Sequence, residues 1–420
     1  MNSSVTPGPT GAGPSTAPGV AAAAHRALVR LAPELVELRR RVHSHPELGF
    51  AEHATAALVA RRLDGLGLEV RTGVGGTGVV ADLRGGQSGP RVLVRAELDA
   101  VPVREAGGRP FGADTPESAP AGHLCGHDAH LAALVGVATV LSGLREGLAG
   151  SFRFCFQPAE ELLAGAAAMI ADGVLDGVDL ALGAHVLSGL PYGTVSANPG
   201  LVLSGADFFR LAVRGGGGHA GTPGQFADAL LAAAHVTTAL QALPARETPL
   251  EDALVVGLGS VRGGNAANAA PEEVVVLGNL RWFEPGVAER ARRRVGEIAA
   301  GVAGALGCST GLEWTGHAPP LANDPALAAA AAGALSAEGV AAVVHARPLT
   351  ASDDFAEFSS RMPGLFLGVG CGGPDAAPHH HPRFTVDERA MLLTARVLAS
   401  AALALSRAGR RRGVAQPARP

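Results

Sequence analysis

The alternation of short apolar runs with longer helical ones constrains the fold of this chain more than any other feature. Runs with the length of buried strands lie at residues 91–96, 151–156, 179–183 and 365–369. Helical patterns lie at residues 21–41, 52–66, 131–144 and 162–171. Strands that alternate with helices predict an α/β fold with a largely parallel sheet. Asp128 is well placed to cap the third of these helices.

The middle of the chain follows a different order and predicts a second, smaller unit. Strand and helix patterns succeed one another as β-α-β-β-α-β, at residues 207–214, 226–243, 253–261, 273–283, 287–306 and 308–315. This is the order of the ferredoxin-like unit. We therefore expect a discontinuous α/β domain over 21–203 and 317–406, with an inserted α+β domain over 204–316. A chain of 420 residues is long enough for two domains.

The two ends of the chain have the composition of solvated segments. Residues 1–20 are rich in Ser, Thr, Pro and Gly and lack the basic and apolar regions of a signal peptide, which predicts a disordered leader. Residues 407–420 are basic and predict a flexible tail. No uninterrupted apolar run reaches the roughly 18–20 residues of a membrane helix. We expect a cytoplasmic protein without a membrane partner.

Charge and cysteine content exclude several function classes. The net charge of −4 gives no electrostatic reason to expect nucleic-acid binding. The sequence contains no lysine, which excludes a Schiff-base lysine and a P-loop lysine. The four cysteines lie too far apart for the disulfide framework of a small secreted protein.

Metal-binding and acid–base residue types gather at the ends of the predicted strands. In open α/β sheets, ligands bind outside the carboxyl ends of the strands, so we expect these side chains to converge. A thiolate, imidazoles and carboxylates together suit zinc or a similar transition ion. The residues concerned are Glu97, Asp99, Cys125, His127, Glu160, Glu161, His185 and the run from His379 to His381.

Taken singly, each of these residues has a structural interpretation. Cys125 can be a structural cysteine, although Cys-x-His places two ligands on one side of an extended segment. The pair Glu160 and Glu161 suits the first turn of a helix, and His185 suits a satisfied core histidine. Their joint placement favours a metal site. One glutamate would bind the metal and the other would accept and return a proton, but the spacing leaves open which does which.

At these residues the chain resembles the amidohydrolase family that includes hippurate hydrolase, indole-acetyl-amino-acid hydrolases and bacterial N-acyl-amino-acid amidohydrolases. Aminoacylase-1 and the glutamate carboxypeptidases belong to the same superfamily. The resemblance runs from about residue 35 to 402. Its stretches are Arg41-Val-His-Ser-His-Pro-Glu-Leu-Gly-Phe50, Arg95-Ala-Glu-Leu-Asp-Ala-Val-Pro102, Cys125-Gly-His-Asp-Ala-His130, Gln157-Pro-Ala-Glu-Glu161, Gly218-His-Ala220, Asn323-Asp-Pro325 and His380-His-Pro-Arg-Phe384.

The resemblance implies a zinc-exopeptidase-like sheet and hydrolysis of the amide bond of an N-acyl amino acid. It implies two divalent ions (zinc, manganese or cobalt), a metal-bound hydroxide as nucleophile and Glu160 as general base. His379 and His381 are expected to be bystanders. The implied metal ligands are Cys125, His127, Glu161, His185 and His380.

The resemblance also assigns residues of the inserted domain to the substrate. His219, Asn268 and Arg281 match the expected contacts, and an arginine fork suits a substrate carboxylate. A solvent-facing strand position is the structural alternative for Arg281. In the wider superfamily, the histidine that matches His219 reaches the neighbouring subunit's metal site, which implies a homodimer through the inserted domain. A role for His219 within its own subunit, or as a turn cap, stays open.

Four short stretches depart from the family pattern without removing a ligand or the base. Glu97 stands where the family usually has Asp, and Asp353-Asp354-Phe355 replaces a Glu-Asp-Phe. Pro223-Gly224 replaces Pro-His, and Asn268-Ala-Ala-Pro271 replaces Asn-Val-Ile-Pro. We expect these departures to affect substrate preference rather than activity.

Three other functions compete with N-acyl-amino-acid hydrolysis. A dipeptidase or carboxypeptidase would use the same site. A non-catalytic relative that only binds acyl amino acids would be expected to lack Glu160 or Cys125, and both are present. A structural zinc protein predicts a closed four-ligand site without a spare carboxylate, and Glu160 argues against it.

Overall fold

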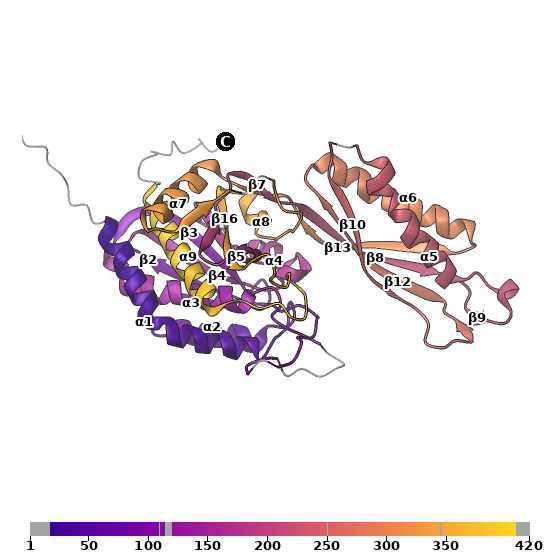
Figure 1. The fold of residues 1–420 in the computed structure, drawn as a ribbon, viewed down its shortest axis with the longest axis horizontal. Coiled ribbons are helices and arrows are strands. Elements are labelled where there is room, and N and C mark those ends of the chain that lie inside the picture. Colours follow the sequence, from indigo (N-terminus) through magenta and orange to yellow (C-terminus); the bar gives the residue numbers. More distant parts are fainter. Residues whose placement is uncertain (1–16, 109, 114–119, 250, 345–346, 409–420) are drawn as a thin grey trace, which may run out of the picture.

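The computed structural model describes residues 17–108, 110–113, 120–249, 251–344 and 347–408. Figure 1 shows a main lobe and a small lobe, which comprises residues 205–318. The first helix, α1, begins at Ala17, so residues 17–20 of the predicted leader are helical. The rest of that leader and residues 409–420 of the predicted tail lie outside the described residues.

The main lobe is built on a mixed, mostly parallel sheet. Its central neighbours β4, β3, β5 and β16 run parallel, whereas β1 and β2 at one edge pair antiparallel. The predicted α/β class is therefore confirmed. In spatial order the strands are β1 (Glu69–Val74), β2 (Gly78–Arg84), β4 (Ala149–Gln157), β3 (Gln87–Glu97), β5 (Leu180–Pro191), β16 (Gly364–Gly372), β6 (Thr194–Ser196) and β15 (Ala341–Val343).

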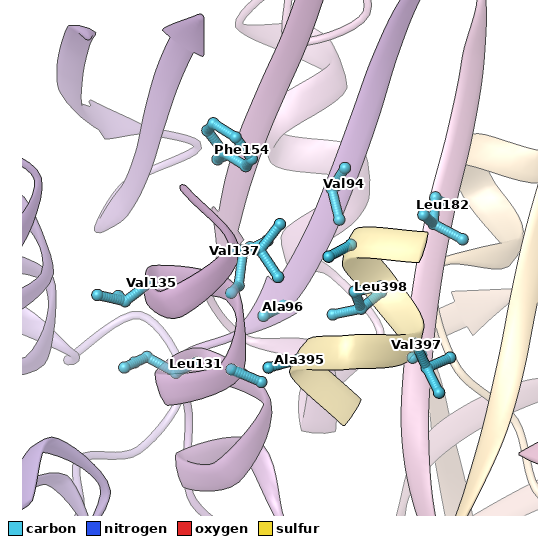
Figure 2. Packing of buried hydrophobic residues seen from close by; sticks show 14 of the residues in the cluster. Val94, Ala96, Leu131, Val135, Val137, Phe154, Leu182, Ala395, Val397 and Leu398 are labelled. Carbon is cyan, nitrogen blue, oxygen red and sulfur yellow. The ribbon is translucent and has the colours of Figure 1, made fainter. Parts of the chain in front are cut away.

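Helices cover both faces of this sheet. Because successive strand residues point to opposite faces, Val94 and Ala96 of β3 join one core and Leu93 joins the other. Figure 2 shows the first core, where residues of α3 and α9 pack on β3, β4 and β5. The main-lobe helices are α1 (Ala17–His43), α2 (His53–Leu63), α3 (His127–Gly143), α4 (Gly165–Ala171), α7 (Pro325–Ala337), α8 (Ala356–Ser359) and α9 (Glu388–Ala408).

Helix α9 is long and apolar enough to cross a membrane by length and composition. Yet 72% of its apolar window is buried, against α1, α3, α7 and the main sheet. It is the central core helix of the main lobe.

The predicted cap of α3 is wrong. The helix begins earlier than expected, at His127, and its N-cap is Gly126 with a left-handed backbone at φ 102°. Asp128 lies inside the first turn and is fully buried, where it accepts a hydrogen bond from Arg39 at 3.0 Å and lies 2.9 Å from His43 Nδ1. Its carboxylate therefore binds α1 to α3 instead of capping a helix.

The small lobe is an antiparallel four-stranded sheet covered on one face by two helices. Its order, β10-β12-β8-β13, places the first and third strands in the centre, as the β-α-β-β-α-β prediction requires. Asp228 caps the first helix by accepting from the backbone N–H of Leu230 and Leu231. The elements are β8 (Gly205–Arg214), α5 (Ala229–Leu240), β10 (Leu254–Arg262), β12 (Glu273–Trp282), α6 (Pro285–Ala305) and β13 (Ser309–Ala318).

The base of the small lobe, where it joins the main lobe, carries a polar cluster around buried Asp207. Its carboxylate accepts hydrogen bonds from Trp282 Nε1 at 2.7 Å and from Arg292 at 2.5 Å, and His317 Nδ1 lies 2.7 Å away. At the opposite tip, β9 (Gly218–His219) pairs with β11 (Ala269–Ala270) in a short two-stranded antiparallel sheet, the tip sheet (Figure 1).

A pair of short strands, β7 (Gly200–Leu203) and β14 (Leu321–Asn323), lies where the chain enters and leaves the small lobe. Buried Asn323 donates to the carbonyls of Asn198 and Phe366 at 2.8 and 2.9 Å and accepts from the Phe366 N–H at 2.6 Å. One side chain thus satisfies three backbone groups beside β16.

We expect Asn323→Ala to lower the free energy of unfolding by about 2 kcal/mol or more, because three buried backbone groups lose their partner. Denaturant unfolding followed by circular dichroism measures the change. Asn265→Ala, at an exposed position, is the control and should leave the midpoint unchanged. Equal midpoints for both variants would contradict this role of Asn323.

Candidate metal centre and active site

A cavity opens at the carboxyl ends of the central strands, between the main sheet and the base of the small lobe. Main-lobe residues Cys125, Glu160, Glu161, His185 and His380 line it. Phe208 of β8 and Arg281 of β12 also line it. The convergence predicted from the strand ends is present, and both lobes contribute.

His127 stands at the start of α3 with its two ring nitrogens in different surroundings. Nδ1 donates to the backbone carbonyl of Asp99 at 3.0 Å and lies 3.2 Å from its carboxylate. Nε2 lies 3.8 Å from Glu160 Oε2 and 3.9 Å from Glu161 Oε1. A carboxylate on one ring nitrogen and a free second nitrogen is the arrangement of a metal-binding histidine.

The two glutamates lie in a single 3-10 turn, Glu160–Leu162, that follows β4. Ala159 and Leu163 on either side of it have left-handed backbones, at φ 49° and 51°. Such a conformation costs a residue with a Cβ roughly 1–2 kcal/mol. The backbone N–H of Glu161 donates to Asp99 Oδ2 at 2.9 Å. Asp99 therefore holds both His127 and the turn that carries Glu161.

The other predicted ligands complete the cluster. Cys125 Sγ lies 3.5 Å from His185 Nε2, and His380 Nε2 lies 3.2 Å from Glu161 Oε1. Single donor atoms of Cys125, Glu161 and His380 all lie within 4.8 Å of one another. His380 has a left-handed backbone at φ 65°, and its N–H donates to the carbonyl of Leu124.

His379, expected to be a bystander, lies in the cavity wall. Its Nδ1 is 3.9 Å from Cys125 Sγ, and its ring packs edge-on against that of His185, 5.3 Å between centroids. His381 is not among the residues that line the cavity. The three-residue histidine run therefore directs two rings to the site, which sequence spacing did not indicate.

The surroundings drive the pKa values of the two glutamates apart. Burial, with the charges of Asp353 and Glu161, raises the pKa of Glu160 well above its usual value. Burial acts in the same sense on Glu161, but the hydrogen bond and charge of His380 outweigh it and lower its pKa to about 2. Adjacent carboxyls separated in this way suit different tasks, one as an anion and one as a proton carrier.

One buried atom at the centre of the cluster, His127 Nε2, makes no hydrogen bond within the described residues. Burying a polar atom without a partner costs free energy, so this atom calls for a ligand. Burial and the charges of Glu161 and Glu160 raise the pKa of the Cys125 thiol, and a cation would oppose this rise. The donor set of sulfur, imidazole and carboxylate fits divalent transition ions.

Beneath the glutamates lies a buried network that the sequence analysis did not identify. The Arg95 guanidinium donates to Glu97, to Asp353 at 3.2 Å and to Asp354 at 2.9 Å. Glu97 also accepts from His130 Nδ1 at 2.8 Å. The longer side chain at position 97 is thus held by a cation and an imidazole. The available signal for Arg95 was an arginine inside the apolar run 91–96, in a strand that is buried from Val92 to Glu97.

The small-lobe residues predicted to bind substrate separate into two places. Arg281 lines the cavity, stacks over Phe208 at 5.5 Å and donates to Ser352 and Asn279. It forms no ion pair within the described part of the chain. His219 and Asn268 instead lie exposed at the tip sheet, where the Ala220 N–H donates to the Asn268 carbonyl at 3.0 Å. They do not line this chain's own cavity.

Comparisons with known proteins point to one family. Residues 93–404 match the model of peptidase family M20/M25/M40. N-acetylcysteine deacetylase of Bacillus subtilis is 33% identical over 370 residues, which cover 88% of this chain and 96% of that protein. IAA-amino acid hydrolase ILR1-like 2 of Arabidopsis thaliana is 34% identical over 379 residues, covering 88% of this chain and 84% of that protein.

Solved structures agree with this similarity. The YXEP protein of Bacillus subtilis, described as a dinuclear metal binding peptidase from the M20 family, superposes with a TM-score of 0.70 at 30% identity. The match covers 90% of this chain and 99% of that one. The similarity therefore extends over both lobes.

Asp99→Asn tests how the metal centre is held. In either orientation, the amide NH2 group faces a donor, the ring of His127 or the backbone N–H of Glu161. We expect metal affinity to fall about 10–100-fold, the usual cost of losing such a partner. Competition against a chelating indicator measures it, with Glu297→Gln, at an exposed position of α6, as the control. Unchanged affinity in Asp99→Asn would contradict the role of Asp99.

Proposed function

The chain belongs to peptidase family M20/M25/M40 and is a metal-dependent amidohydrolase; from this we propose that it hydrolyses the amide bond of N-acyl amino acids. One observation carries the proposal. Glu160 and Glu161 face the same cavity as Arg281, a guanidinium without an ion-pair partner in the described residues. That arrangement suits a substrate with an amide beside the glutamates and a carboxylate beside the arginine.

In this proposal, Cys125, His127, Glu161, His185 and His380 would hold two divalent ions. These ions would polarise the scissile carbonyl and lower the pKa of a water. Glu160, whose pKa is already raised, takes the proton from that water and delivers it to the leaving nitrogen. Arg281 orients the substrate by binding its carboxylate. The products are a carboxylic acid and an amino acid.

The cavity wall favours an apolar acyl group or side chain. Around the polar centre it is lined by leucine and phenylalanine side chains. Burying apolar substrate surface against them contributes roughly 25 cal/mol per Å². These residues are Leu163, Leu187, Leu203, Leu349, Phe208 and Phe366.

The terminal carboxylate of a short peptide would meet Arg281 in the same way, so a dipeptidase or carboxypeptidase is the second candidate. The two substrate classes differ in one group: a short peptide carries a free amino group, whereas an N-acyl amino acid carries none. A screen that includes both substrate classes separates the two functions.

The decisive experiment is a hydrolysis screen of acetyl-, benzoyl- and indole-acetyl-amino acids, their carboxamides and matched dipeptides. We expect the N-acyl amino acids with a free carboxylate to be cleaved better than their carboxamides and the dipeptides. Activity should vanish after chelation, and Zn²⁺, Mn²⁺ or Co²⁺ should restore it. Glu160→Gln should lower kcat roughly 10²–10⁴-fold, the usual value of acid–base catalysis, with metal still bound. Full activity in a verified metal-free preparation would refute the proposal.

We further propose that His219 acts in the active site of a second copy of the chain. The imidazole is exposed on the tip sheet and does not line its own cavity, although Arg281 of the same lobe does. Glycines at positions 215–218 precede it and allow unusual backbone angles, with Gly218 at φ 152°. In the partner's cavity, His219 would stabilise the negative charge on the carbonyl oxygen.

Mixing two inactive variants tests this assignment. His219→Ala and Glu160→Gln subunits are combined under conditions that exchange protomers. If His219 acts on its partner, one site of each mixed dimer carries both intact residues, so we expect activity to return towards about half per mixed dimer. A mixture that stays inactive although mixed dimers form, or a fully active monomer, would contradict the assignment.

A further inference from the structure

Glu52, just before α2, is a buried carboxylate that the catalytic scheme does not use. It is fully buried and does not line the cavity. Oε1 accepts a hydrogen bond from the backbone N–H of Ala159 at 2.8 Å, and Oε2 accepts from Thr77 Oγ1 at 2.5 Å. Ala159 directly precedes Glu160, although 107 residues separate it from Glu52.

The hydrogen bond from Ala159 falls where the backbone is under strain. Ala159 has φ 49° and ψ 41°, a conformation that a residue with a Cβ rarely adopts. Its carbonyl accepts from the N–H of Ala164 and of Gly165 on the far side of the turn. The strained residue is therefore held by its N–H on one side, through Glu52, and by its carbonyl on the other.

The surroundings of Glu52 leave little room for the turn to shift. A Cβ at Gly49 would lie 3.1 Å from Ala159 Cα, and one at Gly78 would lie 3.0 Å from Pro158 Cδ. Thr77, the second partner of Glu52, lies directly before Gly78. The segment before α2 and the start of β2 thus form a close-fitting support behind residues 158–159.

We propose that Glu52 is a positioning residue for the Glu160 turn. Its carboxylate holds Ala159 in the left-handed conformation, and this fixes the directions in which Glu160 and Glu161 leave the backbone. The kinetic part of this inference rests on the proposed function, whereas the position of Glu161 is also reported by metal affinity. Buried carboxylates persist only where hydrogen bonds compensate them, and the N–H of Ala159 supplies one.

Three variants separate positioning from bulk stability. Glu52→Met roughly keeps the volume but offers only a weak thioether acceptor in place of the carboxylate. We expect kcat to fall about 10- to 100-fold, since a buried N–H on the catalytic turn loses its acceptor, with little change in KM. Metal affinity should fall as well. Glu52→Gln keeps an amide oxygen that accepts from the N–H of Ala159, so it should retain most of the kcat and of the metal affinity.

The third variant adds Ala159→Gly to Glu52→Met. Glycine adopts left-handed angles without the Cβ penalty, so the turn needs less support. We expect the double variant to recover a large part of the lost kcat and metal affinity. A purely structural defect at position 52 would not be relieved by this change.

Asp172→Ala is the matched control, because Asp172 also accepts from a backbone N–H, that of Gly75 at 2.7 Å, away from the glutamates. It should lower thermal stability and leave kcat unchanged. Wild-type kcat and metal affinity in Glu52→Met would overturn the proposal, as would equal losses in the Gln and Met variants or no rescue by Ala159→Gly. If Glu52→Met does not fold, Glu52→Ala takes its place.

A wild-type chain that hydrolyses no amide would count against the proposed function alone. The metal affinities of the same variants would still decide the role of Glu52.

Discussion

The burial of several carboxylates beside one guanidinium is the interaction on which the rest of the site depends. Arg95 is 1% exposed, and its three nitrogens contact Gln157, Glu97, Asp353 and Asp354. Separating such ions would leave charges uncompensated in a medium of low polarity, which is costly. Two neighbouring strands and the segment 353–354 are therefore held at a fixed distance, and the cavity forms above them.

Much of the architecture could be predicted because it depends on local patterns. The apolar runs at 91–96 and 151–156 became β3 and β4, and the β-α-β-β-α-β order gave the small lobe with its expected strand order. The rule that strand ends converge predicts that Cys125, His127 and Glu161 lie near one another. Apolar runs, and the residues that directly follow them, can be recognised in the sequence itself.

The errors and omissions depend on contacts between distant segments. Asp128 is of a residue type that often caps helices, but here it is buried and contacts Arg39 and His43 of another helix. His379 enters the cavity because its neighbour His380 adopts a left-handed backbone, and spacing does not reveal such an angle. Glu97 and Asp353 meet at one guanidinium although 256 positions separate them in the numbering. Local sequence patterns do not predict contacts between residues so far apart in the chain.

The length of the small lobe makes the position of its tip sensitive to the angle at its base. Its two central strands have ten residues each, which is about 33 Å at the usual rise per residue. They span the distance between the base at Gly205 and the end of the lobe that carries His219. Over that length, a rotation of about 10° at the base would displace the tip by about 6 Å. A side chain at the tip can serve a site elsewhere only if the angle at the base is tightly set. The base, where this angle is set, carries the hydrogen-bonded cluster of Asp207, Trp282, Arg292 and His317.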